Sequence, residues 1–214
     1  MGRALLISLR VLAINIPLLL LLGGGIGWVL AKKDFPGRGL LNLILQLPII
    51  LPPSVLGFYL LVGLGRSKPL MKAGFLFAFP AAVLAALVSS LPIMIQSARA
   101  AFAGVNRGTE EAALTLGRGP ITVFLEITLP LARRGLLVGL ALSCARALGD
   151  FGVTLMIAGN IPGRTQTLPL FIYGQVESIN FARAHTASLL LIAVGVGSLY
   201  LVRKLEDGAH ERLV

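Results

Sequence analysis

The chain has 214 residues, of which 56% are hydrophobic and only 13% are charged, with a mean hydropathy of +0.89. This composition excludes an ordinary water-soluble domain and indicates a polytopic membrane protein, because the apolar residues come in long runs. The formal net charge is +10. Most of the basic excess lies between the runs, where it orients membrane spans and meets anionic headgroups, so it does not indicate nucleic-acid binding.

Five apolar runs are long enough to cross a bilayer, since each span needs about 20 residues. They are Leu5–Ala31, Leu40–Gly65, Gly74–Ala101, Gly135–Ile157 and Ala184–Val202. The first run is longer than the apolar core of a signal peptide, and no clear cleavage site follows it. The sequence therefore predicts an all-α polytopic membrane bundle of about five spans, with residues 1–214 as one domain.

Lys and Arg are divided unevenly between the two sides that alternating spans define. One side holds eleven: Lys32, Lys33, Arg38, Arg99, Arg107, Arg118, Arg133, Arg134, Arg203, Lys204 and Arg212. The other side holds seven: Arg3, Arg10, Arg66, Lys68, Lys72, Arg164 and Arg183. Because basic residues are retained in the cytoplasm, we expect the N-terminus outside and the C-terminus inside. Lys68 and Lys72 argue against this orientation, and a sixth span would place the N-terminus inside.

The segment TEEAALTLGRGPITVFLEITLP, residues 109–130, is too polar to cross a membrane. Thr109 is the expected N-cap of a first short helix, and Glu110 and Glu111 follow in the first turn, where carboxylates favour the helix dipole. Gly117 is the expected stop. On the predicted topology this helix lies in the cytoplasm.

Pro120 begins a second helix in the same segment, at a position that tolerates proline. We expect it to end near Pro130 and to carry apolar residues on one face: Ile121, Phe124 and Leu125. Helices this short are marginal alone, so contacts with this chain or with a partner must hold them.

This segment is similar to the signature of bacterial ABC importer permeases, a Glu-Ala-Ala with a Gly four residues on and an Ile-x-Leu-Pro after nine more. The matching residues are Glu111, Ala112, Ala113, Gly117, Ile127, Leu129 and Pro130. The resemblance implies the type I ABC importer permease fold, with a cytoplasmic coupling loop at about residues 102–134. It also implies that Glu111–Gly117 is the coupling helix, which docks in a groove of a separate ATPase through Glu110, Glu111, Ala112, Ala113, Leu116 and Gly117. The alternative is an amphipathic helix lying on the headgroups.

Three further stretches, FPGRGLLN, LPIILPPSVLGFYLLVGLG and RALGDFGVTLMIAGNIPG, resemble the molybdate and tungstate importer permeases, and the likeness covers nearly the whole chain. It implies a permease homodimer in a bacterial or archaeal inner membrane, with two identical ATPases and a periplasmic or extracellular oxyanion-binding protein. Some members carry an extra N-terminal span, whereas this chain starts at the first core span. Sulfate and thiosulfate permeases are close relatives, and the residues offer no physical discriminator between the substrates.

The sequence contains no Gly-x-x-x-x-Gly-Lys-Ser/Thr loop, so ATP and Mg²⁺ are expected on the partner ATPase and no cofactor on this chain. Catalytic residues are not expected either, because Ser143 and Cys144 have no His or Glu near them. His185 and His210 are isolated, which disfavours a metal site.

Two small-x-x-x-small faces suit close helix packing. They are formed by Gly23 with Gly27 and by Gly135 with Gly139. They fit either a dimer with its pathway at the shared axis or packing within one subunit.

The stretch QLPIILPPS interrupts the second run. Pro52 and Pro53 remove two backbone donors and leave carbonyls one turn earlier unpaired, which lipid-facing backbone does not tolerate. Gln46 and Ser54 add polar groups nearby. We therefore expect these four residues at the translocation path or gate, with a structural kink as the alternative.

Arg146 and Asp150 lie four residues apart, hence on one helix face of the fourth run. A lone charge at mid-membrane costs about 3 kcal/mol, so pairing or a watery interior is expected. Both are path or gate candidates, although a structural pair is favoured because a strong cation would hold an anion too tightly. The polar loop that follows is expected to form an outer gate or to meet the binding protein through exposed residues: Arg164, Gln166 and Thr167.

Together with the resemblance, these residues predict the permease subunit of an ATP-driven oxyanion importer that works by alternating access. Molybdate or tungstate is the predicted substrate, and a sulfate or thiosulfate permease is the alternative. A secondary anion transporter without an ATPase would need coupling carboxylates inside the spans or an inverted repeat. Asp150 alone gives that alternative little support.

Overall fold

The computed structural model describes residues 1–207, without the side chains of residues 70, 198–199 and 201–207. Four residues named above are affected. The side chains of Arg203 and Lys204 are not described, and His210 and Arg212 lie outside the described residues. Within residues 1–207 there are helices and no strand, which confirms the all-α class. In chain order the helices, with η marking π-helical turns, are α1 (Gly2–Leu18), η1 (Leu19–Gly23), α2 (Gly24–Lys32), α3 (Arg38–Ile50), α4 (Pro53–Arg66), α5 (Lys68–Lys72), α6 (Phe79–Ala103), α7 (Arg107–Thr115), α8 (Pro120–Val123), η2 (Phe124–Thr128), α9 (Leu129–Leu148), α10 (Gly152–Ala158), α11 (Leu168–Glu177) and α12 (Phe181–Asp207).

Each of the five predicted runs falls on helical structure, but only two of them are straightforward spans. Gly2–Lys32 and α6 are long and apolar enough to cross a membrane, and the number rises to four if each of two bent pairs counts as one span. The pairs are α3 with α4, bent by 112°, and Pro120–Leu148 with α10, bent by 59°. The fifth run lies on α12, in which Phe181–Gly197 is a shorter apolar helix.

The second and fourth runs are therefore each broken into two helices, and the break in the second lies in the stretch QLPIILPPS, where the prolines were expected to interrupt the helix. The second breaks at Leu51 and Pro52, because consecutive prolines cannot donate backbone hydrogen bonds and push the preceding residue into an extended conformation. The fourth begins earlier than Gly135 and breaks after Leu148.

The expected helix end near Pro130 is wrong. Helix α8 continues through η2 into α9, so Pro120–Leu148 is one long helix. A proline clashes with the carbonyl four residues before it, here Glu126, and a wider π-helical turn at that point lets the helix continue.

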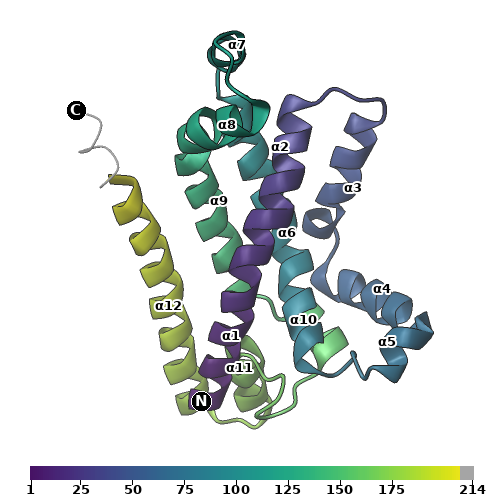
Figure 1. Cartoon of the computed structure of the whole chain (residues 1–214). Helices are drawn as coiled ribbons and strands as arrows, with labels where there is room; N and C mark the ends of the chain where they lie inside the picture. Colours follow the sequence, from purple (N-terminus) through teal and green to yellow (C-terminus); the bar gives the residue numbers. More distant parts are fainter. Residues whose placement is uncertain (208–214) are drawn as a thin grey trace.

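Helix α6 is the centre of the bundle, flanked by α2 and α9 (Figure 1). Both glycine pairs face it: a Cβ atom on Gly27 would lie 2.6 Å from Ala98 Cβ, and one on Gly139 would overlap with Ser97 Cβ. Gly23 and Gly135 approach α6 equally closely. The small-residue faces are thus used inside one subunit, and the alternative use at a dimer axis is not what this fold shows.

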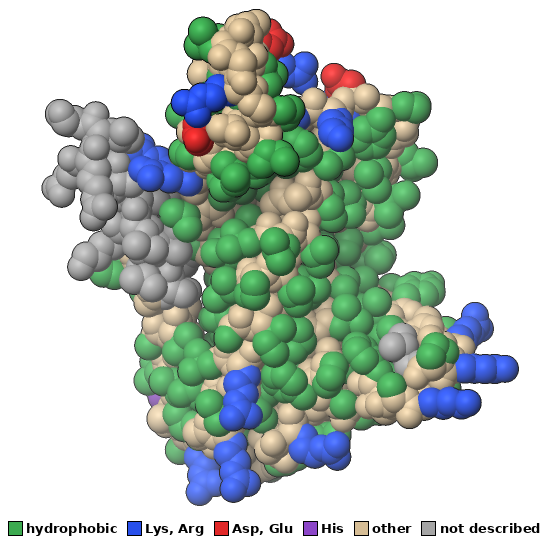
Figure 2. Space-filling model, in the orientation of Figure 1, with side chains coloured by type: hydrophobic (Ala, Val, Ile, Leu, Met, Phe, Trp, Pro, Cys, Tyr) green, Lys and Arg blue, Asp and Glu red, His purple; other side chains and the backbone are tan. Residues whose placement is uncertain are grey.

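The two ends of the bundle differ from its middle. The N-terminus and α11 lie at one end, whereas α7 and α8 project from the other (Figure 1). Figure 2 shows Lys and Arg side chains gathered toward the two ends and mainly hydrophobic side chains between them. This distribution fits a protein whose middle lies in lipid.

Candidate functional site

Helix α7 is the short helix outside the bundle that the motif predicts, and it is called the rod below. It starts earlier than expected. Its N-cap is Asn106, whose side-chain oxygen accepts a hydrogen bond from Gly108 N at 2.8 Å. Thr109 is therefore inside the first turn, and its assignment as the N-cap is wrong. An Asn side chain satisfies a free backbone donor as well as a Thr side chain does. Residue type alone therefore does not decide whether Asn106 or Thr109 is the N-cap.

The other end of α7 is closed by Gly117, as predicted. Gly117 has a φ of +84°, which L side chains rarely adopt. The amide of Gly117 donates to Leu114 O and that of Arg118 to Ala113 O, at 3.0 and 3.2 Å. These two bonds make a Schellman motif that satisfies the last carbonyls of the helix.

One face of α7 is open to solvent. Glu111 and Ala112 are exposed, and Leu116 keeps 85% of its surface accessible. Ala113, in contrast, is buried. An exposed leucine beside a carboxylate on a rigid, well-capped helix is the type of surface that enters a partner's groove.

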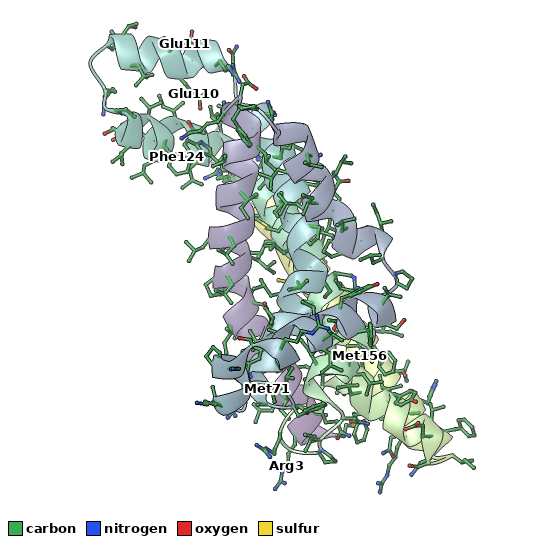
Figure 3. The ribbon with its side chains drawn as sticks, turned by 90° about the vertical axis from the view of Figure 1, so that its right-hand side faces the viewer. Arg3, Met71, Glu110, Glu111, Phe124 and Met156 are labelled. Carbon is green, nitrogen blue, oxygen red and sulfur yellow. The ribbon has the colours of Figure 1, made fainter. Side chains whose placement is uncertain are left out.

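Glu110 points the other way. Its carboxylate accepts hydrogen bonds from Lys32 Nζ at 2.7 Å and from Thr128 Oγ1 at 2.5 Å. Figure 3 shows Glu111 on the outer side of α7 and Glu110 between α7 and the helix that carries Phe124. Of the two adjacent carboxylates, only Glu111 is free to meet another protein.

The remaining motif residues lie where η2 passes into α9. Ile127 and Leu129 are half-buried, and Leu129 packs on the cluster that contains Phe102 and Ala132. Pro130 is exposed in the first turn of α9. These residues fix the path of the chain between the rod and the bundle.

The second helix of the loop has the apolar face that the sequence predicts. Phe124 packs edge-on against Trp28 with ring centroids 5.6 Å apart. Ile121, Phe124 and Leu125 line one apolar groove of about 720 Å³.

The two broken spans meet each other. The break of the α3–α4 pair lies at Pro52, next to Pro53, and a Cβ atom on Gly152 in α10 would come within 2.8 Å of Pro53 Cβ. Pro52, Pro53 and Ser54 are exposed on this chain, which leaves their other side open. The irregular backbone is therefore packed against protein on one side and is not covered by this chain on the other.

Arg146 and Asp150 form an ion pair at 3.5 Å, with the Asp150 side chain 1% exposed and that of Arg146 32% exposed. Asp150 also accepts hydrogen bonds from Thr154 N at 3.0 Å and from Thr154 Oγ1 at 2.6 Å. Its carboxylate thus restarts the helix after the break, as a capping residue does. This geometry supports the structural pairing that the sequence analysis favoured.

The other polar candidates lie apart. Gln46 is half-buried on α3. Of the three loop residues expected to be exposed, Arg164 is exposed and Gln166 is half-buried with its amide on Asn160 Oδ1 at 2.8 Å. Thr167 is buried, so its predicted exposure is wrong; the next amide, Leu168 N, donates to Ser8 Oγ at 2.8 Å and draws this part of the loop into the bundle.

A family profile described as "Binding-protein-dependent transport system inner membrane component" matches residues 23–210. The chain belongs to this family. It is a multi-pass membrane permease component of a transport system, which agrees with the apolar helices described above.

Relatives of this inner membrane component are named as permease proteins of molybdenum or sulfate transport systems. The chain is 39% identical to the molybdenum transport system permease protein ModB of Escherichia coli (strain K12), over 94% of this chain and 90% of the relative. It is 37% identical to the putative molybdenum transport system permease protein YvgM of Bacillus subtilis (strain 168), over 92% and 90%. It is 34% identical to the sulfate transport system permease protein CysW of Synechococcus elongatus, over 95% of this chain and 73% of the relative.

Three residues of the inner membrane component that bear on the site were missed by sequence reasoning. Lys32 and Thr128 donate hydrogen bonds to the Glu110 carboxylate, and Thr154 donates to the Asp150 carboxylate. Lys32 was counted only as a loop cation, and no local pattern links it to a residue 78 positions away. The Asp150–Thr154 spacing of four was a usable signal, because a carboxylate reaches the amide of a helix that starts just after it.

Proposed function

We propose that this chain is the transmembrane subunit of an ATP-driven importer for an oxyanion, with molybdate or tungstate as the substrate. The observation that carries the proposal is α7, a capped helix at one end of the bundle whose exposed face holds the motif residues Glu111 and Ala112, with the exposed Leu116 at its C-cap. The family match and the names of the relatives support it.

The energy for transport comes from a separate ATPase. The sequence has no P-loop, so the chain depends on a partner for ATP binding. The exposed face of α7 enters a groove of that ATPase, which places α7, the loop at about 102–134 and the C-terminus in the cytoplasm. The N-terminus, at the opposite end of the bundle (Figure 1), is then outside.

A second copy of the chain completes the pathway. Among the described residues, none of the thirteen in α3 is buried, and the neighbouring break at Pro52–Ser54 is exposed. Lipid-facing irregular backbone is not tolerated, so another protein surface or water must cover this break. A homodimer whose shared axis passes between the two α3–α4 faces provides both, with Gln46 and Ser54 near the path.

The mechanism is alternating access. ATP closes two ATPases on each other, their grooves draw the paired α7 helices together, and the bundles change from inward-facing to outward-facing. An oxyanion released by an external binding protein then enters, and hydrolysis restores the inward-facing state. No covalent step takes place on this chain.

Reconstitution tests the proposal. Proteoliposomes that contain this chain with its ATPase, supplied with the binding protein and labelled molybdate, are expected to accumulate the anion only when ATP reaches the ATPase side. Competition with unlabelled tungstate and sulfate separates the oxyanions. Sulfate competing better than molybdate would assign the chain to sulfate transport, and uptake by the chain alone without ATP would make it a secondary transporter.

A further inference from the structure

Glu110 joins the rod to two different parts of the bundle. Its two carboxylate oxygens are both used, one by Lys32 and the other by Thr128. The Lys32 and Glu110 side chains are only 11% and 16% exposed, so water screens this pair much less than it screens a surface ion pair. Lys32 Nζ also donates to Val105 O at 3.0 Å, which fixes the segment just before α7.

Few other contacts hold α7 to the body. A cleft of about 310 Å³ lies beside it, lined by Trp28, Leu114 and Phe124 among others. Two other ion pairs lie in this region, and both are exposed. Arg107 and Asp34 are 3.8 Å apart with side chains 59% and 73% exposed, and Arg118 and Glu126 are 2.7 Å apart with side chains 58% and 56% exposed. Exposed pairs of this type contribute little, so the Glu110 contacts are the main polar connection between the rod and the spans.

The two partners of Glu110 lie on two different helices that pack on the central helix α6. Lys32 is the last residue of α2, which packs on α6 through Gly27. Thr128 is the last residue of η2, directly before α9, which packs on α6 through Gly139. A displacement of Glu110 therefore acts on both helices that flank α6.

Each of the two helices that pack on α6 is directly preceded by a π-helical turn. η1 precedes α2, and η2 ends at Thr128. Such turns are rare in helices and occur often at functional sites. They are suitable places for a helix to bend when its end is pulled.

We infer that Glu110 is a positioning residue that transmits the movement of α7 to α2 and α9, and that it is not part of the surface that meets the ATPase. This inference rests on the proposed function. It separates two adjacent carboxylates by role: Glu111 contacts the partner, and Glu110 connects the rod to the bundle.

The matched variants are Glu110→Gln and Glu111→Gln, compared in the full complex with the ATPase. Two quantities are measured: the amount of ATPase that co-purifies, and the ATP hydrolysed per molybdate taken up by proteoliposomes. Glu110→Gln is expected to keep the ATPase bound and to raise the ATP used per anion severalfold. Glu111→Gln is expected to weaken co-purification instead. Loss of the ATPase from Glu110→Gln, or an unchanged ratio, would overturn the inference.

A second pair of variants decides the matter if Glu110→Gln does not fold. Thr128→Ser keeps the hydroxyl that Glu110 accepts from, whereas Thr128→Val has nearly the same shape without it. We expect normal coupling in Thr128→Ser and an increased ATP cost per anion in Thr128→Val. Equal coupling in the two variants would contradict the inference.

A double-mutant cycle adds a test of the connection itself. Lys32→Gln and Glu110→Gln break the same ion pair, so the double variant is expected to be little worse than either single one. Additive effects would show that the two residues act separately, against the inference. If the wild-type complex neither hydrolyses ATP nor moves molybdate, the proposed function fails rather than this inference.

Discussion

Gly152 lies so close to Pro53 that a Cβ atom on the glycine would come within 2.8 Å of the Cβ of the proline. The break of one span is thereby packed directly on the break of the other, although the two residues are far apart in the sequence. This contact joins the α3–α4 pair, which has an uncovered face, to the α9–α10 pair, which follows α7 and α8 in the chain.

The first prediction concerns this contact. Gly152→Val should force the two breaks apart, and overpacking of this kind costs about 1–3 kcal/mol of stability. The expected result is a lower thermal midpoint for the detergent-purified protein and slower uptake, with ATPase binding unchanged because α7 is remote. Gly149→Ala is the control, since its nearest contact is an ordinary 3.5 Å to Ala145 O. Equal midpoints for the two variants would argue against a tight contact between the breaks.

The second prediction uses two glycines of the first span. A Cβ on Gly27 would meet Ala98 Cβ at 2.6 Å and Ile95 O at 2.9 Å, whereas Gly25 has nothing within 4 Å. Gly27→Ala should therefore destabilise the protein by about 1–3 kcal/mol. Gly25→Ala should be neutral or stabilise it by up to about 1 kcal/mol, because alanine favours helix. Thermal unfolding of both variants checks this, and a stable Gly27→Ala would mean that α2 and α6 lie further apart.

The third prediction concerns the end of the rod. Gly117→Ala places a side chain at a φ of +84°, which costs about 1–2 kcal/mol. The last turn of α7 should fray, and the ATPase should bind more weakly in a titration of the purified subunits. Gly119→Ala, at a φ of −70°, is the matched change two residues on. If both variants bind the ATPase equally, the conformation at Gly117 does not matter for docking.

The fourth prediction separates the two roles of Asp150. Asp150→Ala leaves the amide and hydroxyl of Thr154 without their acceptor and removes the partner of Arg146. A buried donor left unsatisfied costs about 1–3 kcal/mol. Asp150→Asn keeps an oxygen for Thr154 and should lose less, as measured by thermal midpoints. An Asn variant as unstable as the Ala variant would show that the ion pair, rather than the cap, is the important contact.

The sequence was most informative where local rules decide the structure. The apolar runs, the stop at Gly117 and the break at Pro52 all follow from chain length, backbone conformation or the missing proline donor. The motif also located α7 correctly, although Asn106 replaced Thr109 as its cap.

Relationships between distant residues were out of reach of such rules. The helix continues through Pro130 because of a π-helical turn, which no residue pattern predicts. The burial of Thr167 depends on Ser8 at the other end of the chain, and the inward turn of Glu110 depends on Lys32. Each of these is set by tertiary packing, which one sequence does not specify by spacing.

The proposed meeting of the exposed face of α7 with an ATPase in the cytoplasm can be tested directly, because one introduced thiol reports the accessibility of this face. The native cysteine, Cys144, is buried, so Leu116→Cys adds a single accessible thiol at a position that is 85% exposed. The measurement is its labelling rate by a membrane-impermeant maleimide. We expect rapid labelling in inside-out vesicles that lack the ATPase, protection once the ATPase is bound, and no labelling of intact cells. Labelling from outside intact cells, or the same rate with and without the ATPase, would contradict the account.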